Sequence, residues 1–445
     1  MDRREFLSLS SQAALGAAAA SAAFHAMPAQ AAPNDRVVVC VAGVRGRGNS
    51  LLNTFARLPQ VDVKYVCDLD ETVLGSRTDQ IEKIIGRRPQ TIKDFRQALD
   101  DDQVDALVLG TPDHWHAIPT IMACQAGKDV YVEKPDGHNA IEGKTMVDVA
   151  RRHSRIVQLG TQARSGKHIP SLLEYLQAGN IGKALFAKAW ESSQQRGIGH
   201  PSDTAPPAGV DYDTWLGPAP KRPFNPARFH GSWRWFFDYG TGDLGNDGVH
   251  RLDLARMALQ AATEGRGEKP LGFPQTISSV GGKYYFDDDQ QFPDVLQVNY
   301  EYAGKTPKLL TYEMRTWSAY HTEGEPEGAA VFGDGGYVII GNGRWRAFDR
   351  KGKQIREEQA GYNDSGHAQN FIDCMHSRAK PAADLETVGH PASLLCHLGN
   401  CAWRAGRTLK FDLGSYTFVG DDDANRYLTR PEYRKPWVLE EIAKG

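Results

Sequence analysis

Residues 36–48 read RVVVCVAGVRGRG, a continuous apolar run followed at once by a glycine-rich turn. A short apolar run of this kind predicts a buried parallel strand, and residues 49–58 predict a helix after the turn. A strand that passes through a glycine-rich turn into a helix is the setting in which dinucleotides are bound. The sequence therefore predicts a cofactor site at the start of the folded chain.

A second apolar run, residues 61–67, ends in Asp68, which lies 20 residues after Gly48. A carboxylate at this spacing accepts from a ribose 2′-hydroxyl and repels a 2′-phosphate, so we expect NAD rather than NADP. The spacing departs from G-x-G-x-x-G because Arg45 takes the place of the middle glycine, and Arg45 and Arg47 keep NADP open as an alternative. The cofactor-binding residues predicted here are Gly43, Arg45, Gly46, Arg47, Gly48 and Asp68.

Further strand and helix signals continue the pattern. Residues 104–109, 129–132 and 156–159 predict parallel strands, and residues 115–126 and 141–153 predict helices, so the first part of the chain is a doubly wound α/β unit. β-rich segments bounded by turn residues follow. These later segments are 184–191, 276–285, 295–302, 309–316 and 329–340, with a helix at 391–406 and a tail through Trp437 that we expect to fold back on the body.

Composition narrows the class of protein. The chain has 445 residues with 52 Lys+Arg against 55 Asp+Glu, and a balance so near zero argues against a nucleic-acid partner. The length predicts two domains. No segment approaches the ~20 continuous apolar residues of a membrane span, so we expect none in the mature protein.

The first residues predict export. Paired arginines at Arg3 and Arg4 precede an Ala-rich, weakly hydrophobic stretch, and Ala29-Gln30-Ala31 offers a cleavage site. Residues 1–31 are therefore interpreted as a twin-arginine signal, and the mature protein as periplasmic.

The six cysteines show no zinc or disulfide spacing, and we expect mostly buried thiols. His114 and His116 lack a third ligand at metal spacing, so no metal is predicted.

Two residues suit proton chemistry. Lys134 follows the apolar strand 129–132, and the carboxyl end of a parallel strand overlies the crevice where a nicotinamide lies. His250 could take a hydroxyl proton while a hydride leaves the same carbon. Each also has a structural alternative, a solvated loop lysine or a core histidine.

In order along the chain, T-P-D-x-x-H at 111–116, A-G-K-x-V-x-x-E-K-P at 126–135, G-T-Q at 160–162 and the segment 242–250 resemble the Gfo/Idh/MocA oxidoreductase superfamily. The resemblance implies an NAD(P)-binding Rossmann domain at 35–160 and a substrate-binding α+β domain at 161–445, built on a large, mostly antiparallel sheet flanked by helices. It also implies a homo-oligomer. The other cofactor-binding residues placed on this basis are Thr111, Pro112, His116, Glu133 and Lys134, with His116 also capping or packing the following helix.

The family usually carries an acid four residues before the histidine, and here that position is Asn246. An amide can orient the ring but cannot stabilise an imidazolium by charge, so His250 should be less basic unless Asp243, Asp247 or Asp253 substitutes. We therefore list Lys134, His250, Asn246 and Asp247 as catalytic candidates.

Two segments are candidates for the substrate. Gln162 and Arg164 lie at the entrance to the second domain and could donate to sugar hydroxyls, or be ordinary linker contacts. Residues 228–239 mix aromatic and charged side chains, which favours a carbohydrate pocket over core. The substrate-binding residues predicted are Gln162, Arg164, Arg234, Trp235 and Asp238, whereas the Pro-rich loops at 201–226 are expected to be solvated surface or subunit contacts.

Three functions remain. The first is a nicotinamide-dependent oxidoreductase that acts on a hydroxyl or keto group of a sugar, glycoside or polyol, with a tightly bound cofactor. The second is a redox-neutral NAD-dependent glycoside hydrolase that oxidises, eliminates, hydrates and reduces. The third is a non-catalytic exported sugar-binding protein, which the presence of both Lys134 and His250 disfavours. Outside the cytoplasm no supply of free nicotinamide is expected, which favours an enzyme that keeps its NAD bound.

Overall fold

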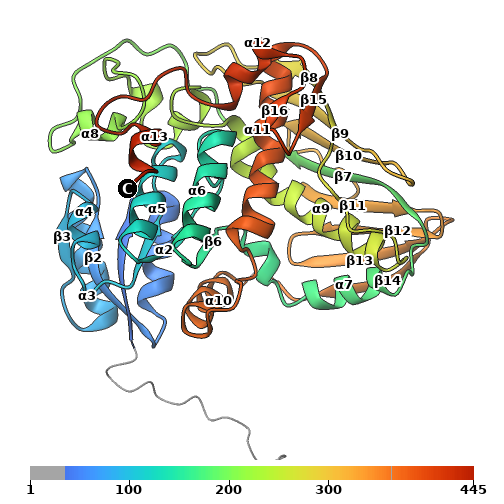
Figure 1. The fold of residues 1–445 in the computed structure, drawn as a ribbon, viewed down its shortest axis with the longest axis horizontal. Helices are drawn as coiled ribbons and strands as arrows, with labels where there is room; N and C mark the ends of the chain where they lie inside the picture. Colours follow the sequence, from blue (N-terminus) through green and yellow to red (C-terminus); the bar gives the residue numbers. More distant parts are fainter. Residues whose placement is uncertain (1–35, 362) are drawn as a thin grey trace, which may run out of the picture. The chain divides into compact units, whose positions relative to one another are not determined.

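The computed structural model describes residues 36–361 and 363–445, so the predicted signal at 1–31 lies outside the described residues. The first of its two sheets is parallel and six-stranded, in the order β3-β2-β1-β4-β5-β6 (Figure 1). This is the order of a doubly wound dinucleotide-binding sheet, and it confirms the predicted fold. The strands are β1 (Val37–Ala42), β2 (Val61–Cys67), β3 (Gln90–Ile92), β4 (Ala106–Leu109), β5 (Asp129–Val132) and β6 (Val157–Leu159).

Helices cover both faces of this sheet because its strands are apolar on both sides. One face packs against α2 (Gly46–Ala56), α3 (Glu71–Ile85) and the late helix α10 (Asp364–Ser377). The opposite face packs against α5 (Ala117–Gln125), α6 (Ala140–Arg152) and the chain's C-terminal tail. Segments from the end of the chain therefore complete the core around the first sheet.

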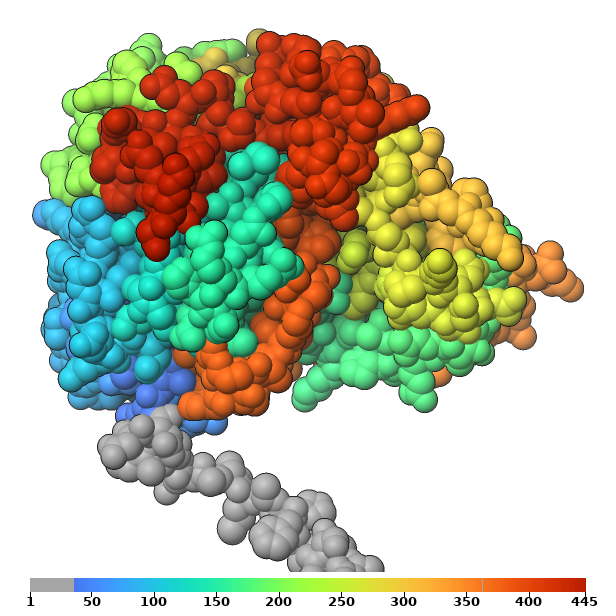
Figure 2. Space-filling view, viewed as in Figure 1, coloured from blue at the N-terminus to red at the C-terminus, as the bar shows by residue number. Residues whose placement is uncertain are grey.

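The tail is held by aromatic contacts. Trp437 lies 4.9 Å from Trp115 and 6.4 Å from Phe95, centroid to centroid. Figure 2 shows the dark red tail against the blue and cyan residues of the first sheet's layers. Three short helices lie in this part of the molecule: α4 (Arg96–Leu99), α8 (Tyr212–Leu216) and α13 (Leu439–Ile442). Another short helix, α12 (Asp422–Asn425), lies by the second sheet instead.

The second sheet has ten strands in the order β14-β13-β12-β11-β7-β10-β9-β8-β15-β16, and every pairing is antiparallel except that of β7 with β10. One face packs against α7 (Ile169–Gln177), α9 (Val249–Glu264) and α11 (His390–Ala405). The strands are β7 (Ala184–Ser192), β8 (Thr276–Gly282), β9 (Val295–Tyr302), β10 (Lys308–Arg315), β11 (Glu327–Gly333), β12 (Gly336–Gly341), β13 (Arg344–Asp349), β14 (Gln354–Gln359), β15 (Leu409–Asp412) and β16 (Thr417–Phe418).

The strand predicted at 329–340 is instead a hairpin. It turns at Asp334-Gly335, and β11 and β12 pair on either side of that turn. Strands β3, β13, β14, β15 and β16 were not predicted. In the edge strand β14 the sequence QIREEQ is polar and largely exposed and lacks the alternation that marks a half-buried strand.

Two further expectations concern the chain as a whole. All six cysteines are free and buried, as predicted. Among the helices of the described residues, none is long and apolar enough to cross a membrane.

Candidate active site

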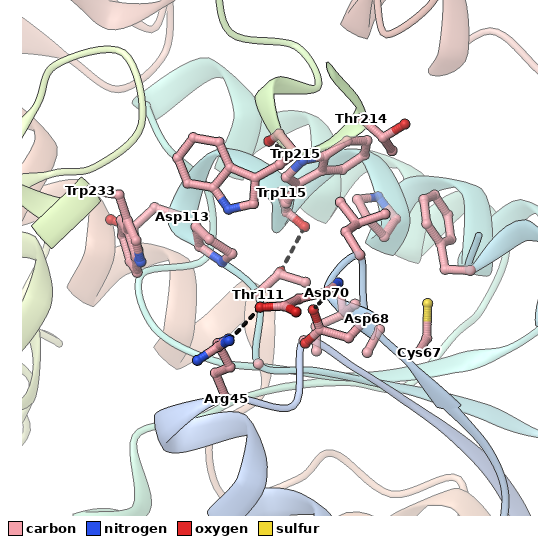
Figure 3. A pocket seen from close by; sticks show the side chains of 18 of the residues that line it. Arg45, Cys67, Asp68, Asp70, Thr111, Asp113, Trp115, Thr214, Trp215 and Trp233 are labelled. Atoms are coloured by element: carbon pink, nitrogen blue, oxygen red, sulfur yellow. Dashed lines mark hydrogen bonds and ion pairs between the residues drawn. The ribbon is translucent and has the colours of Figure 1, made fainter. Parts of the chain in front are cut away.

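A cavity of about 510 Å³ lies at the carboxyl ends of the parallel strands. The turn after β1 and the ends of β2, β4 and β5 form one side of it, and residues from the second part of the chain form the other (Figure 3). Ligands of doubly wound sheets bind at this edge. The cavity is therefore the candidate active site.

The glycine-rich turn fits a dinucleotide. Gly43 has a φ of +76°, and a Cβ there would lie 2.8 Å from the backbone of Thr111. A Cβ on Gly48 would lie 1.6 Å from the carbonyl oxygen of Gly43, so only glycine lets α2 approach the turn this closely. A Cβ on Gly46, where α2 begins, would meet open space. The first N–H groups of a helix lack intrahelical partners and attract a pyrophosphate.

Asp68 stands at the end of β2, as its spacing predicted, and lines the cavity. Its carboxylate accepts from the backbone N–H of Val44 at 2.8 Å and of Asp70 at 3.1 Å, so it also braces the glycine-rich turn. Burial raises the pKa of Asp68. A partly buried carboxylate at this point favours a ribose hydroxyl over a 2′-phosphate.

The two arginines of the turn are committed to carboxylates. Arg45 pairs with Asp70, and Figure 3 shows the two facing each other at the cavity wall. Arg47 donates to Glu133 at 2.8 Å and to Asp364 at 2.9 Å. Because both cations already have anionic partners, neither offers an unpaired charge to a 2′-phosphate.

His116 connects two loops rather than facing the cavity. Its buried ring lies 2.6 Å from the carbonyl oxygen of Pro135 through Nδ1 and 2.9 Å from that of Thr111 through Nε2. Thr111 and Pro112 line the cavity and His116 does not. The structure therefore gives His116 a positioning role, in which it ties the loop after β4 to the loop after β5.

Lys134 projects into the cavity from the end of β5. Its Nζ donates to Oδ1 of Asn246 at 2.9 Å, and both residues line the cavity. Asp113, a lining residue that the sequence reasoning did not single out, accepts from Oγ1 of Thr241 at 2.7 Å. Burial raises the pKa of Asp113, and the positive charge of Lys134 opposes that rise.

His250 lies one helical turn beyond Asn246, at the start of α9. It follows a π-helical turn, Leu244–Gly248, and such turns are frequent at functional sites. Burial, and then the positive charge of Lys134, hold the pKa of His250 well below its usual value, so the ring is neutral near pH 7. His250 is partly buried and does not itself line the cavity.

Three carboxylates gather behind Asn246. Oxygens of Glu191, Asp243 and Asp247 lie within 4.8 Å of one another, and Asn246 donates to Asp243 at 3.3 Å. Burial, and then repulsion among these acids, raises the pKa values of Glu191 and Asp243. The group could not be recognised in the sequence, because Glu191 comes from β7, far along the chain from the other two. Asp253, the other suggested substitute for the family acid, is instead held by Arg164.

The predicted substrate residues separate into two groups. Arg234 lines the cavity, together with its neighbour Trp233. The other four do not line it. Gln162 donates to Glu133 at 2.9 Å and to Tyr131 at 3.1 Å, and Arg164 pairs with both oxygens of Asp253 at 2.7 and 2.8 Å. Trp235 is 4% exposed within an aromatic core, and Asp238 pairs with Arg222.

Residues 207–217, which we call the strap, cross the cavity mouth beside Asp68. The expectation that residues 201–226 are solvated surface or subunit contact agrees with the exposure of residues 202–209, but Val210, Thr214 and Trp215 line the cavity. A β-bridge joins Val210 to Asp70, the carbonyl of Gly209 accepts from the N–H of Glu71 at 3.1 Å, and the N–H of Asp211 donates to Leu69 at 3.0 Å. The aromatic residues among the prolines, Tyr212, Trp215 and Phe224, were the available signal, since all three pack in one cluster.

The C-terminal tail anchors the strap. Arg434 donates to the Asp213 carboxylate at 2.8 Å and to the carbonyl oxygen of Gly217 at 2.9 Å. Trp437 also lines the cavity. Strap and tail therefore form one covering over the edge of the first sheet.

Solved structures share this fold. The WlbA dehydrogenase from Bordetella pertussis, in complex with NADH and UDP-GlcNAcA, has a TM-score of 0.61 at 16% identity, covering 85% of this chain and 99% of that one. The aldose-aldose oxidoreductase from Caulobacter crescentus, complexed with glycerol, has a TM-score of 0.63 at 16% identity, covering 84% of this chain and 100% of that one.

Comparisons of sequence agree with the architecture. A glycosyl hydrolase family 109 protein from Shewanella baltica is 28% identical over 206 residues, which are 42% of this chain and 45% of the relative's length. The model of the oxidoreductase family's NAD-binding Rossmann fold matches residues 15–161, and the model of its C-terminal alpha/beta domain matches residues 189–266 and 327–439. With both of its domains matched, the chain belongs to the Gfo/Idh/MocA oxidoreductase family and carries that family's NAD-binding Rossmann domain.

Proposed function

We propose that the protein is an NAD-dependent oxidoreductase that acts on a hydroxyl or keto group of a sugar, glycoside or polyol. The observation that carries this proposal is the hydrogen bond between Lys134 and Asn246 inside the cavity that also holds the glycine-rich turn and Asp68. Bound NAD supplies the hydride acceptor and donor. The family, the UDP-GlcNAcA bound to the WlbA dehydrogenase and the name of the aldose-aldose oxidoreductase support a sugar substrate.

The chain's own residues divide the remaining work. The first N–H groups of α2 hold the pyrophosphate, and Asp68 accepts from the ribose. Lys134 and the neutral His250 hold or accept the proton of the substrate hydroxyl, a transfer that requires a side chain positioned at the reacting group. Trp233 and Arg234 offer an aromatic face and hydrogen-bond donors to the sugar.

We further propose that NAD stays bound through turnover. The strap is hydrogen-bonded to Leu69 and Glu71, which directly follow the ribose-binding Asp68, and Arg434 fixes it from the tail. We expect these bonds to slow the loss of a cofactor that is bound beside Asp68. Retention suits a protein that works where no free nicotinamide is supplied.

A second candidate is the redox-neutral glycoside hydrolase. The glycosyl hydrolase family 109 relative supports it, although the match spans less than half of that protein. A retained NAD would serve this reaction equally well, because the hydride that is taken from the sugar is later returned. A non-catalytic binding protein would not need the partly buried Lys134–Asn246 pair.

We also propose that residues 1–31 are a twin-arginine signal that exports the protein to the periplasm, and this proposal rests on the sequence alone.

A homo-oligomer is also proposed, in which the subunits meet through the face of the second sheet that the helices leave open. Partly buried aromatic side chains stack across that face, with ring centroids 4.7–5.5 Å apart, in the series Phe186, Phe332, Tyr337 and Phe348.

The deciding experiment uses the mature protein purified without added cofactor. Its absorbance from 260 to 400 nm is recorded, and free sugars and nitrophenyl glycosides are then added. A rise at 340 nm without aglycone release supports the oxidoreductase, whereas aglycone release without net reduction supports the hydrolase. A protein that neither contains nor binds NAD would refute both.

A further inference from the structure

A second cavity, of about 300 Å³, lies on the other side of the segment that leads to Asn246. Its walls come from the loop after β5, the segment 237–241, helix α11 and the tail residues 427–432. No residue lines both this cavity and the candidate active site. Its volume could hold a molecule of monosaccharide size.

Two deeply buried side chains in this wall each carry an unmet hydrogen-bonding atom. Asn400, 8% exposed, uses its Nδ2 to donate to the carbonyl oxygen of Thr241 at 2.7 Å, while its Oδ1 has no partner among the described residues. Arg430, 6% exposed, donates through Nη1 to the carbonyl oxygen of Asp238 at 2.8 Å, while its Nη2 has no such partner. Buried polar groups are normally satisfied, so an unmet acceptor and an unmet donor in one wall point to a ligand.

The acceptor and the donor call for different groups. Oδ1 of Asn400 needs a donor such as a hydroxyl, and a guanidinium N–H needs an oxygen acceptor, of which a carboxylate is the strongest. A second guanidinium, that of Arg404, lies 4.4 Å from the ring centroids of both Phe237 and Tyr427 and forms no ion pair with any described residue.

Three acidic side chains lie near these cations, and one of them, Glu142, already pairs with Arg430. Asp238 is already paired with Arg222, and Glu432 is exposed at the rim. The carboxylate of Glu142 lies 3.3 Å from Nε of Arg430, which leaves Nη2 of that residue free. We propose that this cavity binds a small hydroxylated carboxylate, a sugar acid, with its carboxylate toward Arg404 and Arg430 and a hydroxyl toward Asn400.

Thr241 connects the proposed ligand site to the active site. The carbonyl of Thr241 accepts from Asn400, and its Oγ1 donates to Asp113 of the first cavity. The ligand site and the reaction site are thus separate in space and joined by one segment of backbone.

The test is calorimetric titration of the NAD-containing full chain with D-glucuronate, D-glucose and inorganic phosphate. We expect one glucuronate per chain, bound at least tenfold more tightly than glucose or phosphate. Arg404→Ala should weaken this binding at least tenfold, and Arg404→Lys should weaken it less because the charge is kept. Arg407→Ala is the matched control, since Arg407 lies three residues later, on the surface, where it pairs with Asp421.

Equal affinity for glucose and glucuronate would overturn the role of the carboxylate, and phosphate binding as tight as that of glucuronate would overturn the role of the hydroxyl. Unchanged affinity in Arg404→Ala would place any binding in another site. If glucuronate does not bind, the cavity holds only water and the proposal is refuted. Because Arg404 lines the second cavity and not the first, loss of affinity in Arg404→Ala separates this site from sugar binding in the first cavity.

Discussion

The two ends of the active-site cavity are built differently. At the cofactor end, the chain passes from Gly43 to Asp68 within one strand-turn-helix-strand unit, and backbone geometry does most of the work. At the substrate end, Asp113, Arg234 and Asn246 come from three separate parts of the chain and meet only in the folded protein. A motif can therefore specify the first end, whereas the second depends on how the two sheets pack together.

The largest expected effect is on turnover, and it concerns Lys134, which lies where the cofactor end and the substrate end of the cavity meet. Replacing Lys134 with Met should lower kcat about 10²–10⁴-fold, because a positioned proton-transferring group contributes on that scale. Bound NAD should remain at wild-type occupancy, because Lys134 bonds to Asn246 and the glycine-rich turn is untouched. The measurement is turnover together with the nicotinamide content of the purified variant.

Lys144→Met is the control for this change, because Lys144 pairs with Asp148 on the surface of α6 and does not reach the cavity. It should keep wild-type turnover. If Lys134→Met also loses its NAD, the two ends are less independent than the geometry indicates. If its turnover is unchanged, Lys134 is a structural lysine.

Asp68→Asn tests the cofactor end alone. The amide oxygen can still accept from the N–H of Val44, but the negative charge that repels a 2′-phosphate is lost. We expect the preference for NAD over NADP to fall about tenfold, equivalent to about 1.4 kcal/mol. Equilibrium titration of cofactor-free protein measures it, with the surface variant Asp79→Asn for comparison, and an unchanged preference would mean that another group excludes NADP.

Arg434→Ala tests the covering over the cofactor. Losing the bonds to Asp213 and Gly217 should loosen the strap and raise the rate of NAD loss about fivefold, close to the ~1 kcal/mol that a net hydrogen bond contributes. The residual NAD is measured at intervals during dialysis by denaturing a sample and assaying the released nicotinamide enzymatically. Arg426→Ala, an exposed tail variant, should lose NAD at the wild-type rate, and equal rates in all three proteins would show that the strap does not retain the cofactor.

The sequence predicted five of the six strands of the first sheet, because these are apolar runs that end in turns, but not β3, which is only three residues long and begins with two polar ones. In the second sheet it merged β11 and β12 into one strand, because the apolar segment continues through a Gly-containing turn, and it did not predict β13, β14, β15 or β16. None of these strands lines the cavity. The position of the tail was anticipated only in outline, since its contacts with Trp115 depend on tertiary packing.

At the site, local motifs were enough to place Asp68, Lys134 and Asn246 at the cavity. In residues 228–239, however, the composition could not show which aromatic side chains line the cavity and which belong to the core. Trp233 lines the cavity while Trp235, two residues later, is buried in the aromatic cluster. The strap was missed because proline-rich loops usually face solvent. Only the contact between Val210 and Asp70, residues distant in the sequence, reveals its position.

Asn246→Asp tests the substrate end with the smallest expected change. The new carboxylate can still accept from Lys134, and it adds a negative charge one helical turn before His250. The pKa of His250 is now lowered by burial and by Lys134, and an opposite charge nearby should raise it by about one unit. A base acts only when neutral, so activity lost below this pKa should be lost at a higher pH in the variant.

The pH profile of kcat/KM therefore measures which group is the base. We expect its acidic limb to move about one unit toward higher pH, with turnover near pH 9 and the affinity for NAD both unchanged. Asp68→Asn should give the opposite result, an altered cofactor preference with an unmoved acidic limb. If the limb stays in place in Asn246→Asp, His250 is not the base, and Lys134 must accept the proton without it.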